Sequence, residues 1–242
     1  MSEPSMSKEY LSIADMMSGL MMVFLLIAVA FMLDVQVSKN EVERQKDEIE
    51  RQKNDMAEIA LIAERSRLQL NQELLKEFGA DLKQWNAEIL KDNTVRFKSP
   101  EVLFGSGKST LRSRFKKILN HFFPRYINIL QRYQQDIEAI RIEGHTSSDW
   151  RYAKDLTTRY LNNVELSQQR ALATLKYCYL RLTEKQQIWL REVLRANGLS
   201  FAKPIFTLQG KENVEKSRRV EFKVVTKAEK KLYQILARSR SK

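Results

Sequence analysis

Asp15 is the residue whose surroundings point most directly to chemistry. It is the only charged residue between Leu11 and Leu33, a run of apolar and small residues slightly longer than the roughly 20 needed to cross a bilayer as a helix. A carboxylate inside such a segment costs roughly 2.5–3.5 kcal/mol on insertion, so it normally faces a partner helix or a wet cavity and handles ions. The segment therefore predicts a membrane helix that carries an ion-binding group.

The same helix offers a face for a neighbour. One stripe at helical spacing contains Ser12, Asp15, Ser18, Gly19 and Met22. The small residues Ser18 and Gly19 would let another helix approach closely. Two alternatives stay open: Asp15 marks the membrane edge and reaches water, or the segment is a cleaved signal peptide with Ala28-Val29-Ala30 as its cleavage site. The apolar run continues to Leu33, which argues against cleavage.

The run DMMSGLMMVFLL, from Asp15 to Leu26, resembles the transmembrane helix of MotB-type stator subunits. The resemblance implies that Asp15 carries the motor's ions, protons in that family, and that Ser18 is the small hydroxyl residue beside it. It also implies a homodimer of this helix inside a ring of five MotA/ZorA-like membrane proteins. Residues 1–10 would then be cytoplasmic, residues 11–33 would span the bacterial inner membrane, and the remainder would be periplasmic. An aspartate helix suits sodium ions equally well.

A seven-residue repeat follows the apolar segment. Apolar residues recur at Val35, Val42, Ile49, Met56, Ala63 and Leu70, and Glu43-Arg44-Gln45-Lys46 is repeated as Glu50-Arg51-Gln52-Lys53. One apolar position per heptad, with glutamines at the second seam position, predicts a weak coiled coil over a linker of residues 34–92. A lone charged helix is the alternative.

Charge divides the chain at about residue 92. The formal net charge is +12, and it is concentrated in residues 93–242, because the first 92 residues are net acidic. A basic half indicates an anionic partner, either cell-wall polymer, lipid headgroups or nucleic acid, or else an ordinary solvated surface. No nucleic-acid-reading motif accompanies it, and no nucleophile–base pair suggests an enzyme. The single Cys178 lies in an apolar, helical-looking run and predicts a core thiol.

Two features could suggest a cofactor or a metal, and neither is convincing. Phe104-Gly105-Ser106-Gly107-Lys108-Ser109-Thr110 resembles a phosphate loop, but the required first glycine is replaced by Val102. His145 has no cysteine or acid at metal-ligand spacing, so it is interpreted as a hydrogen-bonding residue at a strand end. We expect no cofactor and no metal.

Residues 93–226 predict one α+β domain. Strands are expected at 94–97, 137–142 and 217–224, with a helix over 110–135 that Pro124 bends or splits. A second helix starts at Asn163, and an inserted helix from about Leu182 ends at Asn197-Gly198. Residues 227–242 form a basic, helix-prone tail.

Three motifs in this domain resemble the OmpA-like peptidoglycan-binding domain: Gly144-His145-Thr146, the pattern N-x-x-L-S-x-x-R-A from Asn163 to Ala171, and Arg218-Arg219-Val220-Glu221. The resemblance implies a βαβαβ fold with a mixed sheet and a clamp for the zwitterionic end of diaminopimelate. Arg170 would hold the carboxylate, with Asn163 and Leu166 in the same wall. The acid of that family falls on Ser147 here, and Asp149 is the possible substitute.

The short linker and the inserted Thr183-Glu184-Lys185-Gln186-Gln187 helix resemble the MotB-like subunits of Zorya anti-phage systems more than flagellar ones. The favoured function is therefore the B subunit of an ion-driven rotary stator anchored to peptidoglycan, serving phage defence. The alternatives are a motility stator and a peptidoglycan tether without transport.

Overall fold

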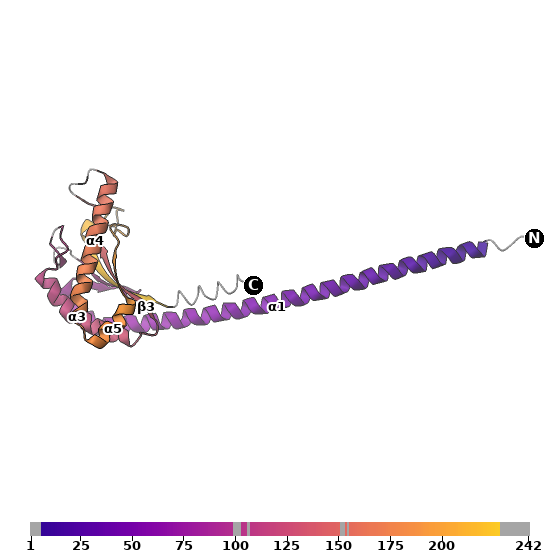
Figure 1. Ribbon diagram of the computed structural model, residues 1–242, viewed down its shortest axis with the longest axis horizontal. Coiled ribbons are helices and arrows are strands. Elements are labelled where there is room, and N and C mark those ends of the chain that lie inside the picture. The colour runs from indigo at the N-terminus through magenta and orange to yellow at the C-terminus, as the bar shows by residue number, and fades with distance from the viewer. Residues whose placement is uncertain (1–5, 99–102, 106, 151–152, 154, 228–242) are drawn as a thin grey trace, which may run out of the picture. The chain divides into compact units, whose positions relative to one another are not determined.

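The computed structural model describes residues 6–98, 103–105, 107–150, 153 and 155–227, with side chains from Ile13 onward. The chain divides into two compact units, residues 1–57 and 58–242. Helix α1 (Met6–Trp85) contributes to both units (Figure 1). The expected tail at 228–242 lies outside the described residues.

The first unit is the early part of α1, and its apolar side chains have no protein cover. Phe24 is 64% exposed and Met32 is 70% exposed, and their apolar neighbours are similar. By length and composition this stretch of α1 could cross a membrane. Because exposed apolar surface on this scale is rare in water, it indicates lipid or another chain as the surrounding medium. Val35, Val42 and Ile49 are exposed as well.

The last third of α1 belongs to the second unit. Leu70, Leu74 and Phe78 are buried in its core, and Arg125 of the next helix pairs with Glu77 and Asp81 at 2.7 and 2.9 Å. The helix ends at Trp85, and Asn86, with φ of 50°, turns the chain into the sheet. The interval 34–92 expected as linker thus includes residues that the structure places in the folded unit.

The sheet has five strands: β1 (Ala87–Ile89), β2 (Val95–Phe97), β3 (Ile137–His145), β4 (Leu194–Gly198) and β5 (Arg219–Thr226). Their order is β1-β2-β5-β3-β4, with β4 parallel to β3 and the other neighbours antiparallel. The expected α+β class with a mixed sheet is confirmed.

The helices of the second unit are α3 (Ser113–Gln131), α4 (Leu156–Tyr179), α5 (Glu184–Val193) and the short α6 (Val214–Ser217). Pro124 lies inside α3 without dividing it. Helix α4 begins seven residues before the expected start at Asn163, because Asp155 caps it by accepting a hydrogen bond from the Thr158 amide.

The inserted helix is α5, and its predicted end was wrong. A capping box between Thr183 and Gln186 starts α5, but Leu194 is already extended and Leu194–Gly198 forms β4 beside β3. Gly198, which suggested the helix stop, instead lies in β4, where only a residue without a side chain can pack this close to α4. A Cβ at Gly198 would come within 2.4 Å of the Gln168 amide nitrogen of α4.

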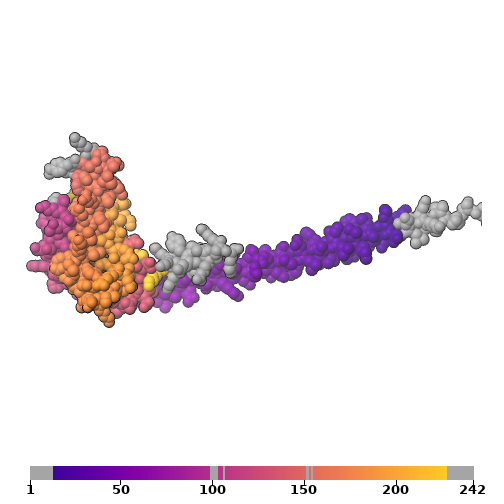
Figure 2. All heavy atoms as spheres, viewed as in Figure 1, coloured from indigo at the N-terminus to yellow at the C-terminus, as the bar shows by residue number. Residues whose placement is uncertain are grey.

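The core lies between the sheet and its helices. Phe122 of α3 sits 5.1 Å from both Phe97 and Phe222 between ring centroids, and Phe78 of α1 joins the same cluster. Cys178 is buried, as its apolar context predicted. In Figure 1, α4 passes in front of the strands, and Figure 2 shows α4 and α5 forming much of the visible face of the second unit. A Cβ at Gly144 would come within 2.2 Å of the Ser167 carbonyl oxygen, so α4 is held close to β3.

Candidate functional site

Arg170 is the centre of the candidate site. Its position on α4 leaves it only 6% exposed, with Nε donating to the Lys108 carbonyl at 3.0 Å and the guanidinium 5.0 Å from the centre of the Phe104 ring. No carboxylate is among the partners seen for it in the described residues. Burial, and then the charge of Arg218, lowers the pKa of Arg170 to about 10. This guanidinium is thus a buried cation that an anionic ligand would stabilise.

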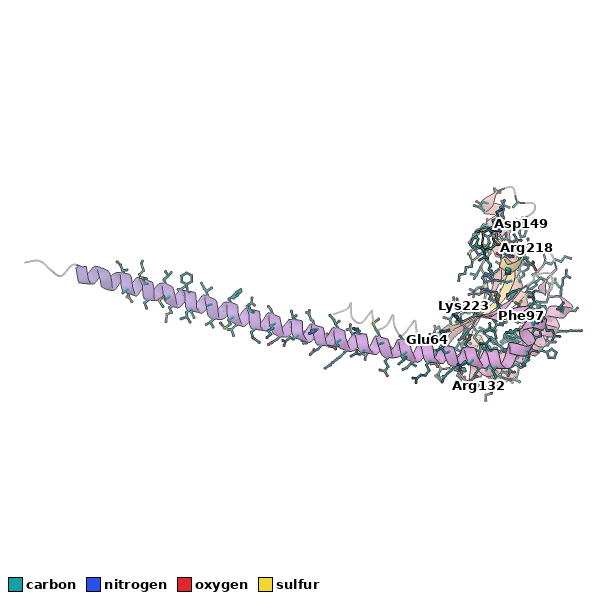
Figure 3. The ribbon with its side chains drawn as sticks, turned by 180° about the vertical axis from the view of Figure 1, so that it is seen from behind. Glu64, Phe97, Arg132, Asp149, Arg218 and Lys223 are labelled. Atoms are coloured by element: carbon teal, nitrogen blue, oxygen red, sulfur yellow. The ribbon has the colours of Figure 1, made fainter. Side chains whose placement is uncertain are left out.

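Arg218 is the second cation of the site. It precedes β5, and its Nε donates to the Ser147 hydroxyl at 2.9 Å, while a terminal nitrogen lies 3.5 Å from an Asp149 carboxylate oxygen. Figure 3 shows Asp149 and Arg218 beside each other. The acid suggested for the clamp therefore contacts Arg218, not Arg170.

The two other residues predicted for the wall lie on the same face of α4 as Arg170. Asn163 is buried, and its amide donates to the Arg159 carbonyl of its own helix at 3.0 Å. Leu166 is half-buried. Asn163 is thus hydrogen-bonded within α4, whereas Arg170 carries a charge that has no carboxylate partner in the described part of the chain.

A further carboxylate lies next to the site. Glu212 accepts hydrogen bonds from the Ser148 amide at 3.1 and 3.2 Å, and from the Ser148 hydroxyl. The 146–149 loop that follows β3 is thereby tied to the segment before β5. Sequence reasoning missed Glu212, since nothing in the spacing pairs it with Ser148. It also missed the role of Arg218, although Arg218 belongs to a motif that was recognised.

The Gly-rich loop at 104–110 serves the site in another way than a phosphate loop would. An isolated bridge between Phe104 and Leu111 closes it, and its Lys108 carbonyl accepts from Arg170. A phosphate loop instead turns its amides toward the ligand. The loop thus presents an acceptor and an aromatic ring to a guanidinium.

Three buried ionisable groups form a second cluster. Glu143, His145 and Glu221 place ligand-type atoms within 4.8 Å of one another, and His145 Nε2 lies 3.4 Å from Glu221 and 3.7 Å from Glu143. Burial alone would raise the pKa of Glu221, but His145 and Arg219 hold it far below the usual range.

This cluster is already neutralised by protein cations. Glu221 accepts from Arg219 at 2.6 Å and from Arg96 at 2.7 Å, and Arg96 also pairs with Glu88 at 2.9 Å. A metal ion would have to displace a guanidinium and leave it buried without a partner, which is costly. The donor set therefore fits a structural ion-pair network better than a metal centre.

Asp15 and Ser18 lie three residues apart on α1, and both are exposed. No ion pair among the described residues reaches Asp15. The membrane segment thus presents its single carboxylate outward, toward whatever surrounds the helix.

An apolar helix long enough to cross a membrane, followed by a mixed-sheet domain with a buried arginine on α4, is the organisation expected of a membrane-anchored OmpA-like protein. The OmpA family model matches residues 103–218. The chain is 42% identical to Zorya protein ZorB of Escherichia coli over 232 residues, which covers 95% of this chain and 93% of that protein. The chain therefore belongs to the ZorB family.

A solved structure supports the fold. The crystal structure of a MotB-like protein from Desulfovibrio vulgaris has a TM-score of 0.50 and 24% identity, covering 67% of this chain and 96% of that one. The expected resemblance to MotB-like and ZorB-like proteins is thus confirmed.

Proposed function

We propose that this protein is the B subunit of an ion-driven rotary stator of the Zorya type, which acts in anti-phage defence. The observation that carries the proposal is the single carboxylate, Asp15, in an otherwise uncharged membrane segment. Membership of the ZorB family and the OmpA-like domain support it. No enzymatic activity is part of this role.

In the proposed assembly, two copies of α1 lie inside a ring of five MotA/ZorA-like subunits in the inner membrane. The N-terminus is cytoplasmic and the OmpA-like domain is periplasmic. Asp15 accepts an ion from one side of the membrane and releases it to the other, and Ser18 offers a hydroxyl beside it. Because the ion neutralises Asp15, each cycle changes how the helix contacts the ring.

The second unit supplies the fixed point. Arg170 is a buried cation without a carboxylate partner among the described residues, so it suits the carboxylates of peptidoglycan stem peptides. Anchoring the pair of domains to the wall would let the surrounding ring turn against a stationary axis. Co-sedimentation of the full-length protein with isolated sacculi tests this half of the proposal.

Ion uptake tests the motor half. Cells producing the chain with its MotA/ZorA-like partner are compared with cells carrying Asp15→Asn, which keeps the side-chain size and removes the charge. We expect the flux to vanish in Asp15→Asn. Asp34→Asn is the matched control, since Asp34 follows the apolar segment directly and should tolerate the change.

A resting channel that awaits a trigger would give no flux in either form. The comparison is therefore repeated with the 35–56 segment deleted, and phage protection is scored alongside. Full flux and full protection with Asp15→Asn would overturn the motor and leave a wall tether, which needs Arg170 but not Asp15.

A further inference from the structure

Most of the N–H donors of Arg170 have no acceptor among the residues that the structure describes. A guanidinium has five N–H donors, and one hydrogen bond, to the Lys108 carbonyl, is seen in the described residues. The Phe104 ring adds a weak attraction for the cation but accepts no strong hydrogen bond. At 6% exposure, such a group is stabilised when an anion with acceptor oxygens arrives.

The group beside Arg170 is a second guanidinium. The Thr146 amide donates to the Ser200 carbonyl at 2.9 Å, and the Ser200 amide donates to the Ser167 hydroxyl at 3.0 Å. The loop whose Ser147 binds Arg218 therefore lies against α4 about one turn before Arg170. The charge of Arg218 accordingly adds to burial in lowering the pKa of Arg170. Arg218 is 36% exposed, so it can reach a ligand from solvent, and it already engages both Ser147 and Asp149. Two like charges repel, and an anionic group bound between them relieves the repulsion. A ligand ammonium would increase it.

The nearby carboxylates do not reverse this balance. Asp149 is 63% exposed and its recorded partner is Arg218, while Glu212 accepts from the amide and hydroxyl of Ser148. Neither is among the recorded partners of Arg170 in the described part of the chain. Of the acids that the structure describes here, Asp149 thus contacts Arg218 and Glu212 contacts Ser148, and neither supplies Arg170 with a carboxylate.

We infer that Arg170 and Arg218 together bind two carboxylates of one peptidoglycan stem peptide, and that the ligand's ammonium group is not required. The inference rests on the proposed wall-anchoring function and specifies its ligand. In place of a clamp for a zwitterionic end, the site is selective for a dicarboxylate. Ser147, where an acid would attract an ammonium group, instead accepts a hydrogen bond from Arg218.

Blocked ligands test the inference directly. Soluble stem peptides containing diaminopimelate are prepared unmodified, acetylated at the free amine, amidated at one carboxylate, or amidated at both. Their affinities for the full-length protein in detergent are measured by titration calorimetry. We expect acetylation to change Kd less than about twofold, and each lost carboxylate to weaken binding about tenfold, as for charge-assisted hydrogen bonds.

Variants of Arg218 sharpen the test. Arg218→Gln should weaken binding of the unmodified peptide about tenfold. In this variant, amidation of the carboxylate that Arg218 would bind should cause no further loss of affinity. Arg218→Glu places an acid beside Arg170, so the free amine should then bind more tightly than the acetylated form. Arg195→Gln is the control, because Arg195 is exposed on β4 and its recorded bond is to the Glu192 carbonyl. Thermal melting confirms that each variant is folded.

Two results would overturn the inference while leaving wall anchoring intact. One is a tenfold loss on acetylation of the amine with the unchanged protein. The other is an unaltered affinity in Arg218→Gln. Failure of the unchanged protein to bind isolated sacculi would instead overturn the anchoring function, and the inference with it.

Discussion

The two units of the chain differ in whether their key charged side chains have ion-pair partners. In the first, Asp15 is the single charge between Leu11 and Leu33, and no ion pair among the described residues reaches it. In the second, Glu143, His145, Arg219 and Glu221 are all buried and contact one another. A buried charge with partners stabilises the fold, whereas a charge in apolar surroundings without a partner among the described residues marks a place where an ion or ligand can bind.

The same difference separates two buried arginines of the second unit, Arg170 and Arg219. Arg170 shares near-complete burial with Arg219, at 6% and 4% exposure, but Arg219 has the Glu221 carboxylate at 2.6 Å and Arg170 has a carbonyl and a ring. The two arginines thus form a matched pair for separating structural from functional charge.

Removing the charge at the centre of the network should have the largest effect on stability. Glu221→Gln leaves Arg96, Arg219 and His145 around a neutral group, so we expect a loss of about 3–5 kcal/mol in the free energy of unfolding. Urea titration of the full-length protein in detergent measures it. Glu77→Gln removes a half-exposed partner of Arg125 and should cost below ~1 kcal/mol. Equal losses in the two variants would contradict the distinction between the network and the surface pairs.

The same network predicts an acid-sensitive fold. His145 and the neighbouring cations lower the pKa values of Glu143 and Glu221 despite their burial. Their contribution is therefore fully present above the ordinary glutamate value, about 4.3, and is lost as the pH falls through the lowered values. We expect the free energy of unfolding from urea titration to fall between pH 5 and pH 3 by on the order of 2 kcal/mol more than it does in Glu221→Gln. Parallel pH curves for the two proteins would assign the acid sensitivity elsewhere.

Much of this arrangement was predictable because local patterns specified it. The apolar run around Asp15 required a membrane helix, and alternation at 137–142 and 217–224 predicted two strands that the structure pairs as β3 and β5. The motif spacing predicted the domain type.

What sequence reasoning missed depends on tertiary contacts. Leu194–Gly198 is a strand because β3 offers it a parallel edge, which no local signal reveals. The end of α1 joins the core because Phe78 meets Phe122, 44 positions later. Arg170 of α4 and Arg218, which precedes β5, likewise come close only when α4 packs against the sheet that contains β5.

The smallest predicted change in the free energy of unfolding distinguishes Arg170 from Arg219. Folding disfavours the charged form of Arg170, since burial and Arg218 lower its pKa to about 10, far below the ordinary value. Arg170→Met removes that cost at the loss of one hydrogen bond to Lys108. We therefore expect the free energy of unfolding to rise by about 0.5–2 kcal/mol, while binding to sacculi is lost.

Arg219→Met is the matched control, because it leaves Glu221 with one partner fewer and should destabilise the protein. Thermal melting and sacculus co-sedimentation on the same preparations measure both properties. A strong loss of stability in Arg170→Met would make Arg170 a structural residue. Stability retained together with lost binding would show that this arginine is kept for its ligand, because the fold without its charge is at least as stable.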